Sequence, residues 1–142
     1  MAISPFATGA LGPVQALVAA CLLIAQADGE VTPDERGRMI ESLGARAPPS
    51  GDEGVAFIDD ALTAFEALEA GFEARPEEAW AEAELMIRAL KGRSAAPDIA
   101  AAATAVAIDG GLTAEERSLL LDICDWLDVR PTALVLWPRP SA

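Results

Sequence analysis

The sequence contains no histidine and no tyrosine, and only two of its 142 residues are cysteine. Without histidine it lacks the commonest general base and the commonest protein ligand of metal ions. It also lacks a nucleophile motif, a glycine-rich phosphate loop and a dinucleotide-binding fingerprint. We therefore expect that the protein is not an enzyme. Paired carboxylates, which serve as acid and base in some hydrolases, leave catalysis as the weakest alternative.

Basic residues are scarce as well. The chain has ten Lys and Arg residues but 23 Asp and Glu residues, so its formal net charge is -13 at pH 7. Such a surface repels phosphate groups, which argues against DNA, RNA and anionic lipid surfaces as ligands. The excess of carboxylates favours cations or basic protein surfaces as partners, unless it serves only solubility.

Aromatic residues make up only 5% of the chain, whereas 52% of its residues are hydrophobic. This alanine-rich composition of low bulk suits closely packed helices better than a β-sandwich. No stretch of useful length alternates between apolar and polar residues as a strand would. Because a chain of this length can bury one sizeable core, we expect a single all-α domain.

The two cysteines, Cys21 and Cys124, each lie in an apolar helical run. We expect them to be small buried residues in a reducing compartment, the cytoplasm, although a disulfide between them stays open. The apolar run at residues 16–25 resembles the core of a secretory signal peptide. No Lys or Arg precedes Arg36, however, and the run is short for a membrane span, so a buried helix is the favoured interpretation.

Apolar spacing, prolines and glycines predict six helices and a short seventh. The six are expected at about residues 13–27, 33–44, 55–72, 76–92, 97–109 and 114–127, and the short one at 131–137. The buried side of the fourth helix is expected to draw on Trp80, Leu85, Met86, Ile87 and Leu90. The domain then covers residues 12–137, with a loose arm at 1–11 and a frayed tail at 138–142.

A ten-residue segment occurs twice. Residues 27–36 read ADGEVTPDER and residues 108–117 read IDGGLTAEER, and an apolar helix precedes each copy. In both copies a threonine and a glutamate three residues later form the pattern of a capping box, which opens the following helix. The chain therefore resembles two helix-turn-helix units joined by two middle helices.

Each copy places one aspartate at the end of a helix and one glutamate at the start of the next, seven residues later. The helix dipole disfavours Asp28 and Asp109 at helix C-termini, and a bound cation would compensate. A ligand set of oxygens alone points to Ca²⁺ or Mg²⁺, with Mn²⁺ as a further choice. The alternative is structural, because capping and turn chemistry account for every repeated residue except the arginine.

The first copy also matches the second half of an EF-hand loop, with Gly29 at the sixth position and Glu35 at the twelfth. The first and third ligand positions would then fall on Ile24 and Gln26, which carry no carboxylate. The second copy has alanines at both positions. A true EF-hand is therefore rejected.

An alanine-rich helix, the Ala-Asp-Gly-x-Val-Thr-x-x-Glu pattern and its second copy together resemble the TerB-like family of tellurite resistance proteins. The resemblance covers nearly the whole chain and implies a helical fold with a pseudo-twofold axis. It also implies that the two motifs approach each other, so that four carboxylates share one acidic metal site: Asp28, Glu35, Asp109 and Glu116. Ile108 and Gly111 depart from the pattern without touching these four residues.

The resemblance further implies a role in tellurite resistance and stress responses, alongside protein partners, some of them associated with membranes. We therefore expect a non-enzymatic helical module that binds a divalent cation. The alternative is an acidic helical scaffold that binds a basic protein and needs no metal. Between Asp52 and Glu84 the chain has eleven acidic residues and one arginine, which suits either such a scaffold or a solvated helix face.

Overall fold

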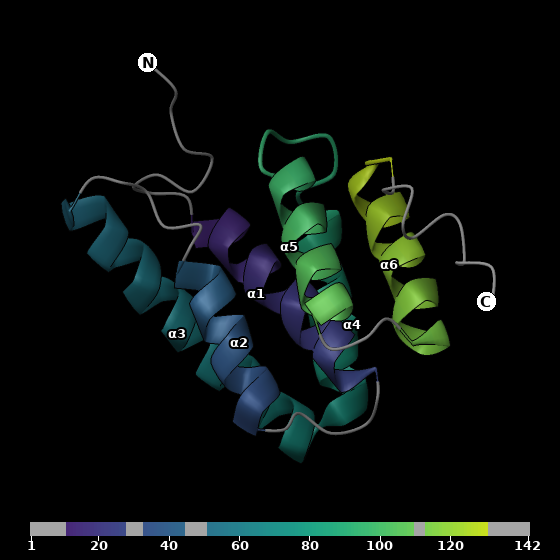
Figure 1. Ribbon diagram of the computed structural model, residues 1–142, viewed down its shortest axis with the longest axis horizontal. Coiled ribbons are helices and arrows are strands. Elements are labelled where there is room, and N and C mark those ends of the chain that lie inside the picture. Colours follow the sequence, from purple (N-terminus) through teal and green to yellow (C-terminus); the bar gives the residue numbers. More distant parts are fainter. Residues whose placement is uncertain (1–10, 28–32, 45–50, 110–112, 131–142) are drawn as a thin grey trace.

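The computed structural model describes residues 11–27, 33–44, 51–109 and 113–130. These residues form six α-helices and no strand, so the predicted all-α, single-domain bundle is confirmed (Figure 1). The helices are α1 (Leu11–Gln26), α2 (Pro33–Gly44), α3 (Gly51–Ala74), α4 (Pro76–Arg88), α5 (Ala96–Asp109) and α6 (Ala114–Leu127). The predicted seventh helix and tail lie outside the described residues, as does the predicted arm except Leu11, which belongs to α1.

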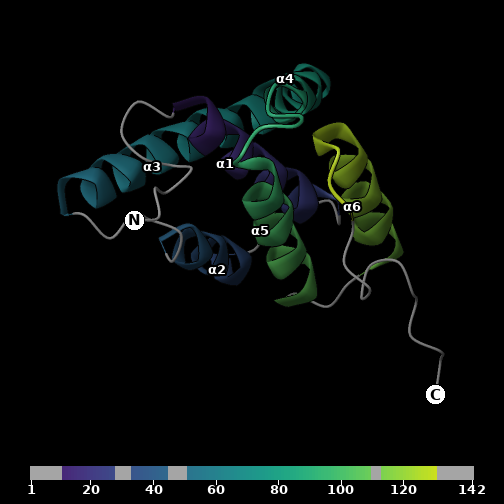
Figure 2. The same ribbon diagram turned by 90° about the horizontal axis from the view of Figure 1, so that it is seen from above.

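Helix α1 runs through the middle of the bundle. Figure 2 shows α3 and α4 on one side of it and α2 and α5 on the other, and α1 contacts each of the other five helices. Residues 16–25 are each at most 3% exposed. A helix that is apolar on every face must be covered all round, and here five helices cover it. Among the described helices, none is long and apolar enough to cross a membrane.

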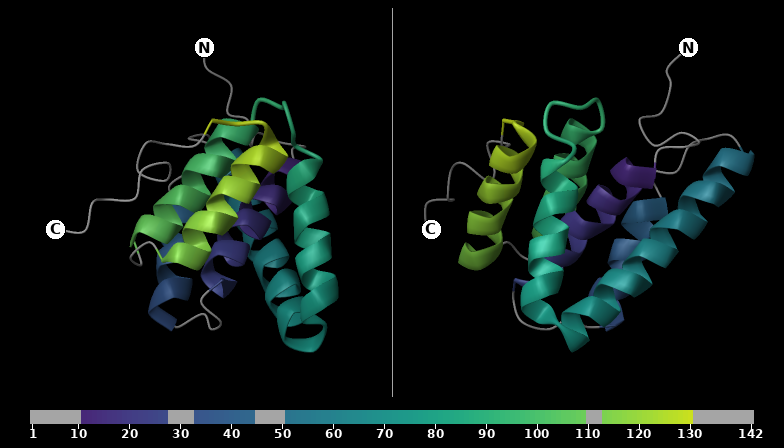
Figure 3. Two further views of the ribbon diagram at one scale, coloured as in Figure 1. Left: turned by 90° about the vertical axis from the view of Figure 1, so that its right-hand side faces the viewer. Right: turned by 180° about the vertical axis from the view of Figure 1, so that it is seen from behind.

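Helices α3 and α4 meet at a sharp turn and diverge from it in a V (Figure 3, right view). Arg75 separates them, and Pro76 opens α4 at a position where its missing N–H costs no hydrogen bond. Near the turn the two helices approach closely: a Cβ added at Gly71 in α3 would lie only 3.4 Å from the Cβ of Ala79 in α4. Small residues therefore set the spacing of this pair.

The buried face of α4 differs from the expected one at Leu85, which is 68% exposed. The inward positions are Ala79, Ala83 and Ile87, spaced four residues apart. Leu85 lies two residues from Ala83 and Ile87, which places it on the opposite side of the helix. Alanine therefore fills two of the three inward positions of α4 and isoleucine the third.

Helix α6 buries the face that the sequence predicted: Leu119, Leu120, Ile123, Cys124 and Leu127. Cys21 and Cys124 are buried thiols in α1 and α6 and do not form a disulfide with each other. Burial raises the pKa of the Cys124 thiol. It therefore behaves as a small apolar residue, as expected from its sequence context.

The turn after α4 depends on Gly92, whose φ of 72° lies in the left-handed region. Its backbone N–H donates to the carbonyl oxygen of Leu127 at 3.3 Å, which ties the turn to the end of α6. Replacing Gly92 by alanine is expected to lower the free energy of unfolding by about 1 kcal/mol, because a Cβ disfavours this conformation. Urea denaturation measures the change; an unaltered midpoint would contradict the strain argument.

Candidate functional site

The two repeated units cross in the fold. Helices α1 and α2 belong to the first unit and α5 and α6 to the second. Helix α1 contacts α5 and α6, and α2 contacts α5, so each unit's first helix packs against the other unit's second helix. The ends of α1 and α5 and the starts of α2 and α6 all lie toward one edge of the bundle, in its lower half in Figure 1 and in the left view of Figure 3. We call this edge, which joins the helix ends that flank both copies of the motif, the acidic edge.

Of the four predicted metal ligands, Glu116 is the one whose side chain lies within the described part of the structure. It is only 4% exposed. Its Oε1 accepts a hydrogen bond from the Thr113 backbone N–H at 3.0 Å, and its own N–H donates to Thr113 Oγ1 at 3.1 Å. The predicted capping box is therefore confirmed. These bonds fix a buried carboxylate at the start of α6, where the helix dipole favours negative charge.

The other three predicted ligands lie partly or wholly outside the described residues. Asp28 belongs to residues 28–32, which lie outside the described part of the chain. Glu35 lies in the first turn of α2 and Asp109 ends α5, but the structure describes neither side chain. The first predicted capping box, made by Thr32 and Glu35, also lies outside what the structure describes. Among the described side chains, no three carboxylates or thiols gather as metal ligands. A shared site of four carboxylates thus stays a prediction.

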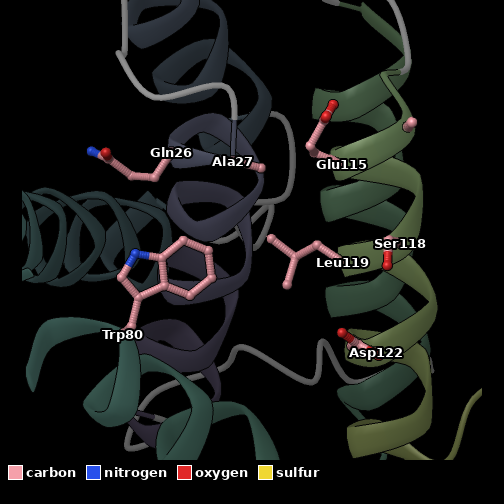
Figure 4. Close-up of a pocket in the computed structure, with 8 residues that line it drawn as sticks. Gln26, Ala27, Trp80, Glu115, Ser118, Leu119 and Asp122 are labelled. Carbon is pink, nitrogen blue, oxygen red and sulfur yellow. The ribbon is translucent and has the colours of Figure 1, made fainter. Parts of the chain in front are cut away.

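A groove of about 530 Å³ adjoins the acidic edge, between the end of α1, helix α4 and the first turns of α6. Figure 4 shows the indole of Trp80 across the groove from Leu119, with Glu115 and Asp122 on either side of Leu119 along α6. The remaining lining residues are Gln26, Ala27, Ala114 and Ser118. No local pattern in the sequence indicates this groove, because its walls come from three helices far apart in the chain.

The family model for tellurite resistance protein TerB matches residues 14–136 of the chain. The chain belongs to the TerB family. Comparison with curated proteins gives no match, and comparison with solved structures gives none either. The family covers both units of the repeat and the two middle helices, so the whole described fold is a TerB domain.

Two arginines of this TerB domain each contact one aromatic ring and one carboxylate. The Arg36 guanidinium lies 5.1 Å from the ring centroid of Phe65, and its Nε is 3.3 Å from Glu69 Oε2. The Arg88 guanidinium lies 5.3 Å from the ring centroid of Trp126, and its Nε is 2.7 Å from Glu84 Oε2. Each arginine thus combines an aromatic face with one carboxylate.

The TerB domain carries a group of exposed acidic residues on α3 and α4. Exposed carboxylates on these helices include Asp59, Asp60, Glu66, Glu73, Glu77, Glu78 and Glu82. Arg75 pairs with Glu78 at 2.9 Å and lies 3.9 Å from Glu82. Such exposed pairs contribute little to stability. The surface of the middle helices therefore carries a strong negative potential.

Proposed function

We propose that this TerB-family chain is a non-enzymatic helical module that binds a divalent cation and acts in tellurite resistance and related stress responses. The crossing of the two repeated units supports the proposal most strongly, because it gathers all four motif-bearing helix ends at the acidic edge. In the sequence, Asp28 and Glu35 lie near the two ends of one copy of the motif, and Asp109 and Glu116 near the two ends of the other. Carboxylates held close together repel one another, and a cation bound between them relieves the repulsion.

The residues at the acidic edge suit a hard cation. The four proposed ligands supply only carboxylate oxygens, the donors that Ca²⁺ and Mg²⁺ prefer and Mn²⁺ accepts. The bonds between Glu116 and Thr113 hold one of these carboxylates in a fixed position. A ligand that is already oriented loses less conformational freedom when it binds metal. Bound metal would supply positive charge that joins the two turns.

Thermal unfolding in chelator and in millimolar Ca²⁺, Mg²⁺, Mn²⁺ or Zn²⁺ tests this proposal. A cation present at a hundred times its Kd stabilises the folded state by about 2.7 kcal/mol, which raises the Tm by roughly 8 °C in a domain of this size. We expect this rise with one of the three hard cations and a smaller one with Zn²⁺. A Tm that is the same in chelator and in all four cations contradicts the proposal.

A variant carrying Asp28→Asn and Asp109→Asn is expected to lose the cation-dependent rise in Tm. Asparagine keeps the shape of aspartate and its capacity for turn hydrogen bonds but removes the charge. The matched control carries Asp59→Asn and Asp60→Asn, both exposed on α3. It changes the net charge by the same amount, so its rise in Tm should equal that of the unaltered protein. Equal losses in both variants would assign the effect to general charge screening.

A second function, an acidic scaffold for a basic protein partner, is favoured by a separate observation. Exposed carboxylates recur along α3 and α4, and the two arginines beside them, Arg75 and Arg88, already pair with neighbouring carboxylates. This surface steers basic proteins toward the domain without itself specifying one. Specific binding therefore requires a shaped site elsewhere.

A further inference from the structure

The groove beside the acidic edge combines a flat aromatic face with two carboxylates. Trp80 is half-buried, and its ring meets Phe72 edge to face, with the ring centroids 6.2 Å apart at an angle of 79°. This contact fixes the orientation of the indole. Glu115 and Asp122 are exposed and line the groove from α6, one turn before and one turn after Leu119. Their carboxylates lie on the side opposite Trp80 (Figure 4).

Elsewhere in the fold, a neighbouring aromatic ring and carboxylate bind an arginine of the same chain in two places. Arg36 occupies the pair made by Phe65 and Glu69, and Arg88 occupies the pair made by Trp126 and Glu84, as described above. In the described part of the chain, the ring of Trp80 has no such cation over it. The groove at Trp80 therefore offers the same recognition chemistry to a cation from outside.

We propose that the groove binds an arginine side chain presented by a basic segment of a partner protein. The guanidinium stacks on the indole of Trp80, and a carboxylate of the facing wall, that of Glu115 at one end of the groove or Asp122 at the other, accepts its hydrogen bonds. Its methylene stem packs on Leu119 and Ala27, which are the apolar walls of the groove. Arginine suits the site better than lysine, because its planar group can stack on a ring and donate two parallel hydrogen bonds to one carboxylate.

The charge of the domain supports a basic partner. The net charge of -13 accelerates the approach of a positively charged segment, while the groove decides where one of its arginines binds. This proposal does not depend on metal binding, since none of the four proposed metal ligands lines the groove.

Titration of ¹⁵N-labelled protein with a nine-residue arginine peptide, in chelator and 150 mM salt, tests the proposal. The three tryptophans give three indole N–H signals, and a Trp80→Phe variant identifies the one from Trp80. We expect the peptide to shift this signal and the amides of residues 26–27 and 114–122, and to leave the Trp126 indole in place. Shifts confined to the acidic faces of α3 and α4 would overturn the proposal.

Paired variants separate the groove from general attraction between opposite charges. Glu115→Gln with Asp122→Asn is expected to weaken peptide binding about five- to tenfold. The control, Asp59→Asn with Glu66→Gln, removes two exposed carboxylates from α3 and should change the Kd less than twofold. Trp80→Leu should weaken arginine binding as well, while amide spectra verify that the fold is intact. Equal losses in the two paired variants would refute the groove, and equal affinity for a nine-residue lysine peptide would refute its preference for arginine.

Discussion

Replacing Leu22 by alanine is expected to lower the free energy of unfolding by about 3 kcal/mol and the Tm by roughly 10 °C. Leu22 is fully buried in α1, the helix that contacts all five others. Its truncation leaves a cavity that no single neighbouring helix can fill without losing contacts elsewhere. Urea and thermal denaturation, followed by far-UV circular dichroism, measure both quantities.

Leu85→Ala is the matched control, because it removes the same atoms from a side chain that is 68% exposed. Its effect is expected to stay within about 0.5 kcal/mol, since the lost surface was already in contact with water and alanine is the better helix former. Similar losses for the two variants would contradict the central position of α1 and the outward position of Leu85. A large loss for Leu22 alone would support both.

Asp28→Asn with Asp109→Asn is expected to change stability in opposite directions with and without metal. In chelator the variant should be more stable than the unaltered protein by roughly 0.6 to 2 kcal/mol, because two charges disfavoured at helix C-termini are gone. With the cation at a hundred times its Kd, the unaltered protein gains about 2.7 kcal/mol that the variant lacks. The variant then becomes the less stable of the two.

Denaturation of both proteins at several cation concentrations locates the concentration at which their stabilities cross. A crossing supports carboxylates that repel one another until metal binds. If the variant is less stable in chelator as well, the two aspartates act through turn hydrogen bonds, and the repeated motif is a structural device. The Asp59→Asn, Asp60→Asn control should show no crossing at any cation concentration.

Local sequence signals predicted most helix boundaries. The α6 bounds, Ala114 to Leu127, were predicted without error, because a capping box marks one end and a break in apolar spacing the other. Pro33 and Pro76 gave the starts of α2 and α4 for a similar reason. The start of α3 was placed too late, at Val55 instead of Gly51. Glycine carries no local helical signal, so the helix extends further than its apolar spacing indicates.

The exposed positions of Leu85 and Ile58 could not be derived from apolar spacing, which treats every large residue as a core residue. Ile58 is 42% exposed, although it belongs to the apolar pattern of α3. Much of the core consists instead of alanines, such as Ala83 in α4 and Ala103 in α5. Alanine is common both in the core and on the surface of helical proteins, so its position in a sequence says little about its burial.

The sequence by itself determined the helical fold, the duplication of the motif, the capping box at Thr113 and the burial of α1. These features follow from local propensity and from apolar residues on every face of one helix. Only the tertiary structure decided that α1 contacts α6 while α2 contacts α5, and that Trp80 faces Glu115 and Asp122 across a groove. Both arrangements bring together segments that are far apart in the chain. They depend on how the helices pack in three dimensions, and no local sequence pattern encodes that packing.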